Sequence, residues 1–306
     1  MKKNAVIYLF LFCLFSFCLL LRYSIWKPTN KSGLPKSLFT LLEMFSANHN
    51  GSLEDIVAVT QKKWLRKAGS ERWEMPIRFE EKRNIVIPLL KDLQLVAKKV
   101  SQKKRYEYAI VLGALLPRVR SRLAYLVRCW KKGVRFKSII VLAGERPLHK
   151  TCESNEGLFD SQNGILPFKE NWTYVGALPK TEYEMAKVVF DQAKLPDSWE
   201  KEVDIVFVNA PMKRRKDGVL LRPNTNDTVK KWMDAKPKPG SCLVISNQPY
   251  IKYQDLVLKT LLPKTFHIET VGGKAYENLP LVIYLDSIAR WLYLEKKRLE
   301  KEVYPE

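Results

Sequence analysis

The sequence predicts an α/β protein: a Rossmann-like, doubly wound, mostly parallel five-stranded sheet, with an N-terminal transmembrane helix and a helical extension before the sheet. Three observations support this fold class. Short apolar runs alternate with helical patterns from residue 106 onwards. These runs are apolar almost throughout, which is typical of parallel strands covered on both faces. One long apolar segment stands at the start of the chain.

The N-terminal segment has the length and composition of a membrane anchor. Met1-Lys2-Lys3 precedes the almost wholly apolar residues 5–21, and the run stops at Arg22. At about 1.5 Å per residue, such a segment just crosses a hydrocarbon core. No small-x-small cleavage site follows, so we expect an uncleaved single-pass anchor. A cleaved signal peptide and a hydrophobic helix of another kind are the alternatives. Basic residues on its two sides are nearly balanced, and we expect the main domain on the non-cytoplasmic side.

The next part of the chain predicts a linker and then helices. Residues 23–34 carry the polar run from Lys27 to Gly33 and are expected to form the linker, and residues 35–105 are expected to form a helical subdomain. Leu38, Leu41, Leu42 and Phe45 follow a helical spacing. Ser52 is a suitable N-cap for a second helix, and a third helical pattern follows at 85–96.

The Rossmann-like domain is expected over residues 106–298, before a short tail at 299–306. Strands are predicted at residues 108–113, 138–144, 203–208, 242–246 and 266–271. Helices are predicted between and after them, at residues 118–132, 181–193, 225–233, 250–262 and 281–297. Right-handed crossovers then give a doubly wound arrangement.

Composition limits the classes of partner. The chain has 306 residues, of which 46% are hydrophobic and 28% charged, as in ordinary globular proteins. Its net charge of +21 is high. Nucleic-acid binding is one interpretation and solvated lysine faces are another, but an anchored protein is closer to anionic membrane lipid, so we expect lipid as a partner and not nucleic acid. The five cysteines form no Cys-x-x-Cys pair. We therefore expect neither a disulfide framework nor a metal site, and no cofactor motif is present.

Candidate ligand-binding residues follow the predicted strands, because ligands of such sheets bind at the carboxyl ends of the strands. Glycines that permit close turns and arginines that favour anions suit this edge. Asparagine, threonine and glutamine side chains in excess of what a helix cap needs also suggest ligand contact. The candidates are Gly113, Arg118, Arg122, Gly144, Arg222, Asn224, Thr225, Asn226, Asn247, Gln248, Tyr250 and Gln254.

Two glutamates are candidates for a general base. With no nucleophile elbow, Walker loop or metal motif in the sequence, Glu145 or Glu182 remains by elimination. Thr181-Glu182 is equally well explained as a helix N-cap with a favourable dipole partner. His149 lies in a loop near the same edge and is a weaker candidate base, whereas His267 is expected to be packed within a strand.

These features resemble the SanA/YdcF/ElyC-like family, also called the domain of unknown function 218 family. The similarity covers residues 106–271 and lies in Val111-Leu112-Gly113, Arg118, Ala143-Gly144, Thr181-Glu182, Asn224-Thr225 and Ser246-Asn247. The resemblance implies a Rossmann-like fold, N-terminal anchoring and a role in bacterial envelope or surface-polymer assembly. The chain departs from the family's pattern where Ala114, Leu115 and Leu116 replace glycines and where Gln248 and Tyr250 stand near an expected histidine. These departures favour binding over acid–base chemistry.

Three functional hypotheses remain open from the sequence. The first is an anchored envelope protein that binds an anionic, phosphate-bearing ligand, such as a lipid-linked sugar precursor, at the sheet edge. The second is a metal-independent transferase or hydrolase acting on a lipid-linked sugar or nucleotide-like substrate. The third is a non-catalytic envelope scaffold. The sequence does not define the oligomeric state.

Overall fold

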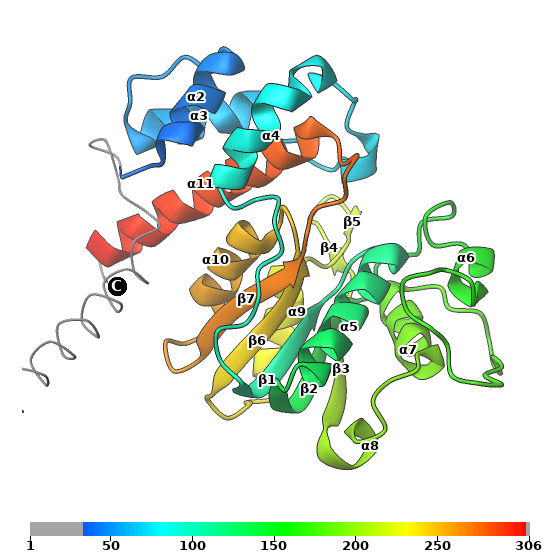
Figure 1. Ribbon diagram of the computed structural model, residues 1–306. Coiled ribbons are helices and arrows are strands. Elements are labelled where there is room, and N and C mark those ends of the chain that lie inside the picture. The colour runs from blue at the N-terminus through cyan, green and yellow to red at the C-terminus, as the bar shows by residue number, and fades with distance from the viewer. Residues whose placement is uncertain (1–32, 304–306) are drawn as a thin grey trace, which may run out of the picture.

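The computed structural model describes residues 33–303. Its centre is one sheet of five parallel strands in the order β3-β2-β1-β6-β7 (Figure 1). The strands are β1 (Arg105–Leu112), β2 (Arg135–Gly144), β3 (Asp204–Ala210), β6 (Ser241–Asn247) and β7 (His267–Gly273). All four neighbouring pairs are parallel. The predicted Rossmann-like α/β fold with a five-stranded parallel sheet is therefore confirmed.

Helices cover both faces of the sheet, which explains why its inner strands β1, β2 and β6 are mostly apolar and buried. In β1, Ala109 and Val111 are buried on the face covered by α5 and α7, whereas Ile110 and Leu112 are buried on the face covered by α9 and α10. The helices of the first face are α5 (Leu116–Lys131) and α7 (Glu182–Gln192). Those of the second face are α9 (Thr225–Asp234) and α10 (Ile251–Leu261). Each buried aliphatic side chain contributes roughly 1.5–3 kcal/mol to folding.

The strand order reverses at the centre of the sheet. The chain leaves β1 towards β2 and leaves β6 towards β7, so the two connections run to opposite sides. In such sheets the crevice outside the carboxyl ends at this point is the usual place for a ligand.

A layer of helices lies over the carboxyl edge of the sheet (Figure 1). It consists of α2 (Lys36–Met44), α3 (Leu53–Lys63), the 3-10 turns η1 (Arg72–Glu74) and η2 (Glu80–Lys82), α4 (Arg83–Asp92) and the C-terminal α11 (Leu281–Val303). Leu41, Leu90 and Ile288 are fully buried in its core, and Tyr250 and Leu256 join the same cluster. The helical layer is thus packed onto the sheet domain.

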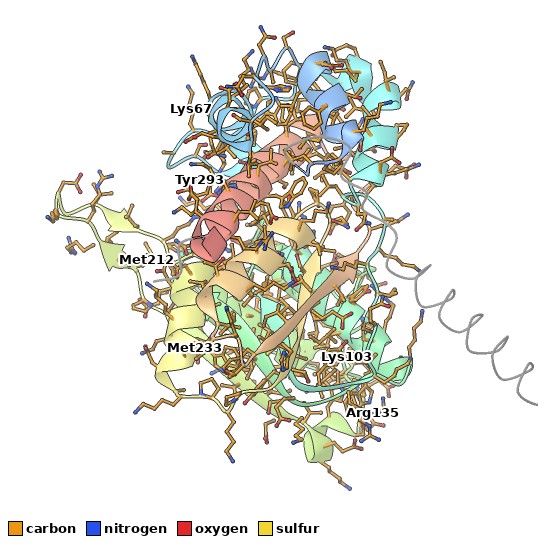
Figure 2. All side chains as sticks on the ribbon, turned by 90° about the vertical axis from the view of Figure 1, so that its left-hand side faces the viewer. Lys67, Lys103, Arg135, Met212, Met233 and Tyr293 are labelled. Atoms are coloured by element: carbon orange, nitrogen blue, oxygen red, sulfur yellow. The ribbon has the colours of Figure 1, made fainter. Side chains whose placement is uncertain are left out.

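Three small elements occupy the connections. They are α6 (Asn155–Phe159), α8 (Trp199–Glu202) and an antiparallel hairpin of β4 (Lys213–Arg214) and β5 (Leu220–Leu221). The hairpin projects from the body of the molecule beyond Met212 (Figure 2).

The expected N-terminal anchor lies outside the described residues. Within residues 33–303, no helix combines the length and the apolar character that crossing a bilayer requires.

Candidate functional site

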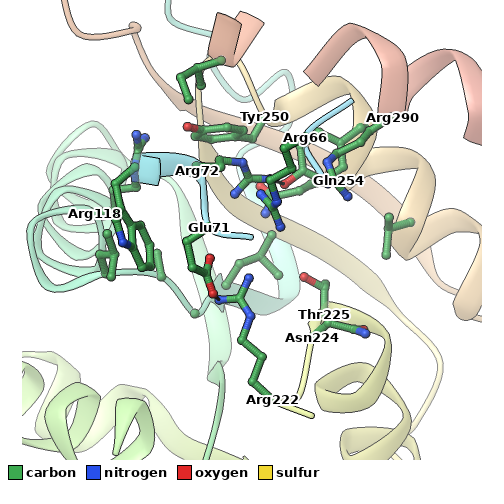
Figure 3. A pocket seen from close by; sticks show the side chains of 18 of the residues that line it. Arg66, Glu71, Arg72, Arg118, Arg222, Asn224, Thr225, Tyr250, Gln254 and Arg290 are labelled. Atoms are coloured by element: carbon green, nitrogen blue, oxygen red, sulfur yellow. Dashed lines mark hydrogen bonds and ion pairs between the residues drawn. The ribbon is translucent and has the colours of Figure 1, made fainter. Parts of the chain in front are cut away.

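A cavity of about 970 Å³ lies between the carboxyl edge of the sheet and the helical layer (Figure 3). The ends of β1 and β2 form its floor through Leu112, Gly113 and Leu142. The start of α9, the α10 helix, the loop from Leu65 to Ile77 and the α11 helix form its walls. Seven arginines and two glutamates are the only charged residues in this lining, so the cavity has a surplus of positive charge.

Three of these arginines gather around one buried carboxylate. Asp286 of α11 is fully buried; its Oδ2 accepts a hydrogen bond from Arg290 Nε at 3.0 Å and lies 3.5 Å from Arg72 Nε. Its Oδ1 accepts from the backbone N–H of Arg66 at 3.2 Å. Burial opposes ionisation of Asp286, but Arg290 and Arg72 outweigh it and hold the pKa of Asp286 below its usual range.

One carboxylate cannot neutralise three guanidinium groups. Burial, followed by the charges of Arg72 and Arg290, lowers the pKa of Arg66. The Nη1 atom of Arg66 is buried and has no hydrogen-bond partner in the part of the chain that the structure describes. Such a group is stabilised by an incoming anion, which would supply both the missing charge and the missing acceptor.

Arg118 and Tyr250 form the adjoining wall. Pro117 near the first position of α5 suits a helix start, and Arg118 follows it. The guanidinium of Arg118 lies 4.8 Å from the centre of the Tyr250 ring, and that of Arg72 lies 4.5 Å from it. Tyr250 is 1% exposed and burial raises the pKa of its hydroxyl. Neither the hydroxyl of Tyr250 nor Nη1 of Arg118 has a hydrogen-bond partner within residues 33–303.

Glu182 is the buried acid of the cavity. It is the first residue of α7, after the Thr181 N-cap, and its Oε1 lies 3.8 Å from Arg146 Nη2. Arg146 already forms two 2.7 Å hydrogen bonds with Glu153, so its charge is shared. Burial, opposed by Arg146 and reinforced by Glu153, raises the pKa of Glu182 to about 7. A carboxyl group with this pKa can donate or accept a proton near neutrality.

The loop before α9 is connected to the helical layer. Arg222 Nη1 lies 2.9 Å from Glu71 Oε1, an ion pair between two parts of the cavity lining that Figure 3 shows. Asn224 caps α9 by accepting from Asn226 N–H, and Asp227 accepts from Asn224 N–H. Thr225 opens the helix and, like Asn224 and Asn226, lines the cavity. Capping therefore accounts for part of the polar surplus predicted in this loop.

Several predicted ligand contacts make hydrogen bonds within the protein. Arg122 donates to the carbonyls of Leu112 and Gly113 and to Asn247 Oδ1, which ties the end of β1 to the end of β6. Burial lowers the pKa of Arg122 to about 10. These bonds use the guanidinium of Arg122 and the side-chain oxygen of Asn247 to fix the floor of the cavity.

The two glutamines after β6 also have partners. Gln248 Nε2 donates to the carbonyls of Gln94 and Ala97 and so holds the chain that leaves the helical layer. Gln254 accepts a hydrogen bond from Ser246 Oγ, although its side chain lines the cavity. Both residues support the site from within the fold.

Gly144 and Glu145, at the end of β2, do not line the cavity, whereas Arg146 does. Glu145 accepts hydrogen bonds from Met212 N–H at 3.3 Å and from Asn209 Nδ2 at 3.5 Å. At Gly144, an added Cβ would lie 2.4 Å from Pro223 Cγ, so this glycine serves close packing. Of the two predicted general bases, only Glu182 lines the cavity.

None of the three histidines lines the cavity, although His149 contacts Trp73, which does. The ring of His149 packs against Trp73 at 4.9 Å between centroids, and its Nδ1 accepts from Cys152 N–H. The expectation that His267 is packed was wrong: it is exposed at the first position of β7. An apolar strand pattern predicts burial for the middle of a strand but not for its first residue, which can lie outside the core as His267 does.

Sequence reasoning missed the residues that come from the helical layer. Glu71, Arg66, Arg72 and Arg290 line the cavity but lie far in sequence from the strand exits. The signal available was Arg66 and Arg72 on either side of the helix-breaking Gly69-Ser70 pair. The spacing of Asp286 and Arg290, one helical turn apart, was another.

The described residues contain no group of three or more His, Cys, Asp or Glu side chains that could hold a metal. Cys129, Cys152 and Cys242 are free. No protein-family model matches the chain, and no curated protein sequence matches it either.

Proposed function

We propose that this protein is a membrane-anchored envelope protein that binds an anionic, phosphate-bearing ligand in the cavity above the carboxyl edge of its sheet. A lipid-linked sugar precursor of an envelope polysaccharide or peptidoglycan is the ligand class we propose. The observation that carries the proposal is the group of Arg66, Arg72, Arg118 and Arg290 in one cavity lining, with Asp286 as the carboxylate that three of them share. Guanidinium groups bind phosphate oxygens through paired, charge-assisted hydrogen bonds.

Inorganic pyrophosphate is a suitable probe for this site. At a concentration of about 100 Kd, a ligand that binds the folded state alone stabilises it by about 2.7 kcal/mol. We expect pyrophosphate to raise the Tm of the full chain in detergent, and an equal ionic strength of sodium chloride to leave it unchanged. Arg118→Gln should remove most of this increase.

Arg128→Gln is the matched control, because Arg128 is exposed on the same α5 helix. It should retain the full pyrophosphate effect. Equal Tm increases in wild type, Arg118→Gln and Arg128→Gln would place the anion elsewhere and remove the proposed site.

A second function is favoured by one specific observation, the buried Glu182 with a pKa of about 7. In a metal-independent transferase or hydrolase, Glu182 would accept the proton of an attacking hydroxyl or water while the arginines stabilise the negative charge on the leaving phosphate. Glu182→Gln should abolish turnover of a synthetic short-chain prenyl diphosphate sugar and preserve pyrophosphate binding. Turnover that survives this substitution excludes Glu182 as the base.

A further inference from the structure

The β4–β5 hairpin is the one small element of the described chain that combines exposed apolar side chains with a dense basic run. Val219, Leu220 and Leu221 are 46%, 54% and 41% exposed and belong to none of the buried clusters. The sequence from Lys213 to Lys216 is wholly basic. Figure 2 shows that the hairpin extends away from the helices and strands around it.

The hairpin has a defined shape before it binds anything. Lys213 pairs with Leu221 and Arg214 with Leu220 in the antiparallel ladder. Arg215 N–H donates to Val219 O, and Gly218 takes a positive φ of 85° in the turn. Apolar and basic side chains are therefore held side by side on a short, ordered arm.

Part of the basic charge is not neutralised. Lys213 forms an ion pair with Asp227, and Arg215 forms one with Asp217. Among residues 33–303, neither Arg214 nor Lys216 forms an ion pair. Arg214 donates a hydrogen bond to the Gly218 carbonyl, so its charge is not balanced by a carboxylate. Two cations without an ion pair beside three exposed aliphatic side chains match the interface of an anionic bilayer, where aliphatic groups enter the headgroup boundary and basic groups meet lipid phosphates.

We propose that the β4–β5 hairpin docks on an anionic lipid surface. This inference rests on the membrane anchoring in the proposed function but does not depend on ligand binding in the cavity. If residues 23–34 act as the proposed linker, twelve residues reach at most about 40 Å, which would keep the domain within reach of the bilayer. The hairpin runs directly into Arg222, Asn224 and Thr225, so docking would bring this part of the cavity lining close to the lipid headgroups.

The full chain in lipid nanodiscs allows a direct test by limited trypsin digestion. Cleavage after Lys213, Arg214, Arg215 and Lys216 is measured by mass spectrometry relative to cleavage after the exposed Lys132, at the opposite end of the sheet. We expect this ratio to fall at least fivefold when phosphatidylcholine discs are replaced by discs containing one third phosphatidylglycerol. An unchanged ratio overturns the proposal.

Two matched pairs of variants separate the contribution of the apolar side chains to lipid docking from that of the basic side chains. Leu220→Ser with Leu221→Ser should restore cleavage in anionic discs, whereas Val175→Ser with Leu178→Ser, which alters residues that are 90% and 51% exposed, should not. Lys216→Gln should weaken the preference for anionic discs about fivefold, as expected for one basic residue at a charged surface, and Lys238→Gln should leave it intact. Equal effects within either pair would show that the hairpin has no special role.

Vesicle flotation of the full chain distinguishes this proposal from the anchoring on which it rests. If the chain floats with phosphatidylcholine vesicles but anionic lipid does not protect the hairpin from trypsin, the membrane anchor is supported and the docking of the hairpin is overturned. Flotation with anionic vesicles alone, lost in the Leu220/Leu221 variant, supports the docking and overturns the anchor. Protection of the hairpin by nucleic acid or an acidic protein, but not by anionic lipid, would assign it to another class of partner and end the proposal.

Discussion

Glu182 shows how one buried residue links stability to pH. Its pKa is raised from 4.5 to about 7 in the folded state, so the folded protein holds a proton that the unfolded chain releases between these values. The contribution of Glu182 to the free energy of unfolding therefore falls as pH rises from 4.5 to 7, by about 3 kcal/mol at most. Below pH 4.5 the carboxyl is protonated in both states, so Glu182 and a glutamine at this position should contribute nearly equally to the free energy of unfolding.

Glu182→Gln should remove this pH dependence. Relative to the wild type, the variant should gain stability between pH 5 and pH 8, as measured by urea unfolding at four pH values. Glu200→Gln, which alters an exposed residue of α8, should give a curve parallel to that of the wild type. A parallel curve for Glu182→Gln as well would show that burial does not hold a proton on this residue.

Among the individual residues of the cavity, sequence reasoning located those from the sheet domain better than those from the helical layer. Gly113, Arg118, Glu182 and Arg222 were predicted from strand exits and do line the cavity. Arg122 was predicted in the right place, but a strand-exit argument cannot tell whether a guanidinium faces a ligand or donates to carbonyls such as Leu112 O. Arg66, Arg72 and Arg290 come from the helical layer, and no local sequence pattern shows that this layer packs over the sheet.

At the scale of single elements, the start of α7 fixes the position of Glu182. Thr181 Oγ1 accepts from Glu184 N–H, and the Glu184 carboxylate accepts from Thr181 N–H, which completes a capping box. Thr181→Ala should lower the free energy of unfolding by about 1 kcal/mol. It should also weaken pyrophosphate binding, because a displaced first turn of α7 would move the Glu182 side chain against Gly113 at the floor of the cavity. Thr181→Ser keeps the hydroxyl and should retain both properties in denaturant titrations. If the alanine and serine variants behave alike, the cap does not support the site.

The exit of β1 depends on the absence of a side chain at residue 113. A Cβ on Gly113 would lie 2.7 Å from both Glu182 Oε1 and Leu142 O. Gly113→Ala should therefore cost about 1–3 kcal/mol of stability and abolish the pyrophosphate-induced rise in Tm. Gly273→Ala is the matched control at the exit of β7, since nothing lies within 4 Å of its added Cβ. A Gly113→Ala protein that binds pyrophosphate normally would show that the floor of the cavity tolerates this expansion.

For the whole molecule, alternating apolar strands and helices were sufficient to predict the sheet, because the inner strands β1, β2 and β6 are buried on both faces over most of their length. The pairing of α11 with the N-terminal helices was not predictable in the same way. Helical periodicity shows that Ile288 faces a core, but not which core. That packing places Asp286 and Arg290 at the cavity.

Asp286 is the residue through which this packing organises the arginines. Asp286→Asn removes the buried charge that faces Arg72 and Arg290, and should lower stability by about 3–5 kcal/mol at neutral pH. Because the pKa of Asp286 is lowered in the folded state, this difference should shrink as pH falls below the usual range for aspartate. Asp255→Asn, which breaks a partly exposed pair with Lys259, should cost less than about 1 kcal/mol in the same unfolding measurements. Equal losses in the two variants would contradict an organising role for Asp286.

The ion pair between Glu71 and Arg222 joins the helical layer to the loop before α9, and it also places a carboxylate in the lining of the cavity. A bound phosphate would compete with Glu71 for Arg222. Glu71→Gln should therefore tighten pyrophosphate binding severalfold, while Arg222→Gln should weaken it, although both substitutions remove the same ion pair. Side chains of this pair are 21% and 40% exposed, so its loss should cost less than about 1 kcal/mol of stability in either variant. Isothermal titration of both variants and the wild type with pyrophosphate measures the change in Kd. Opposite changes in Kd indicate that Glu71 competes with the ligand for Arg222. Weaker binding in both variants would show instead that the ion pair acts by holding the helical layer to the loop before α9.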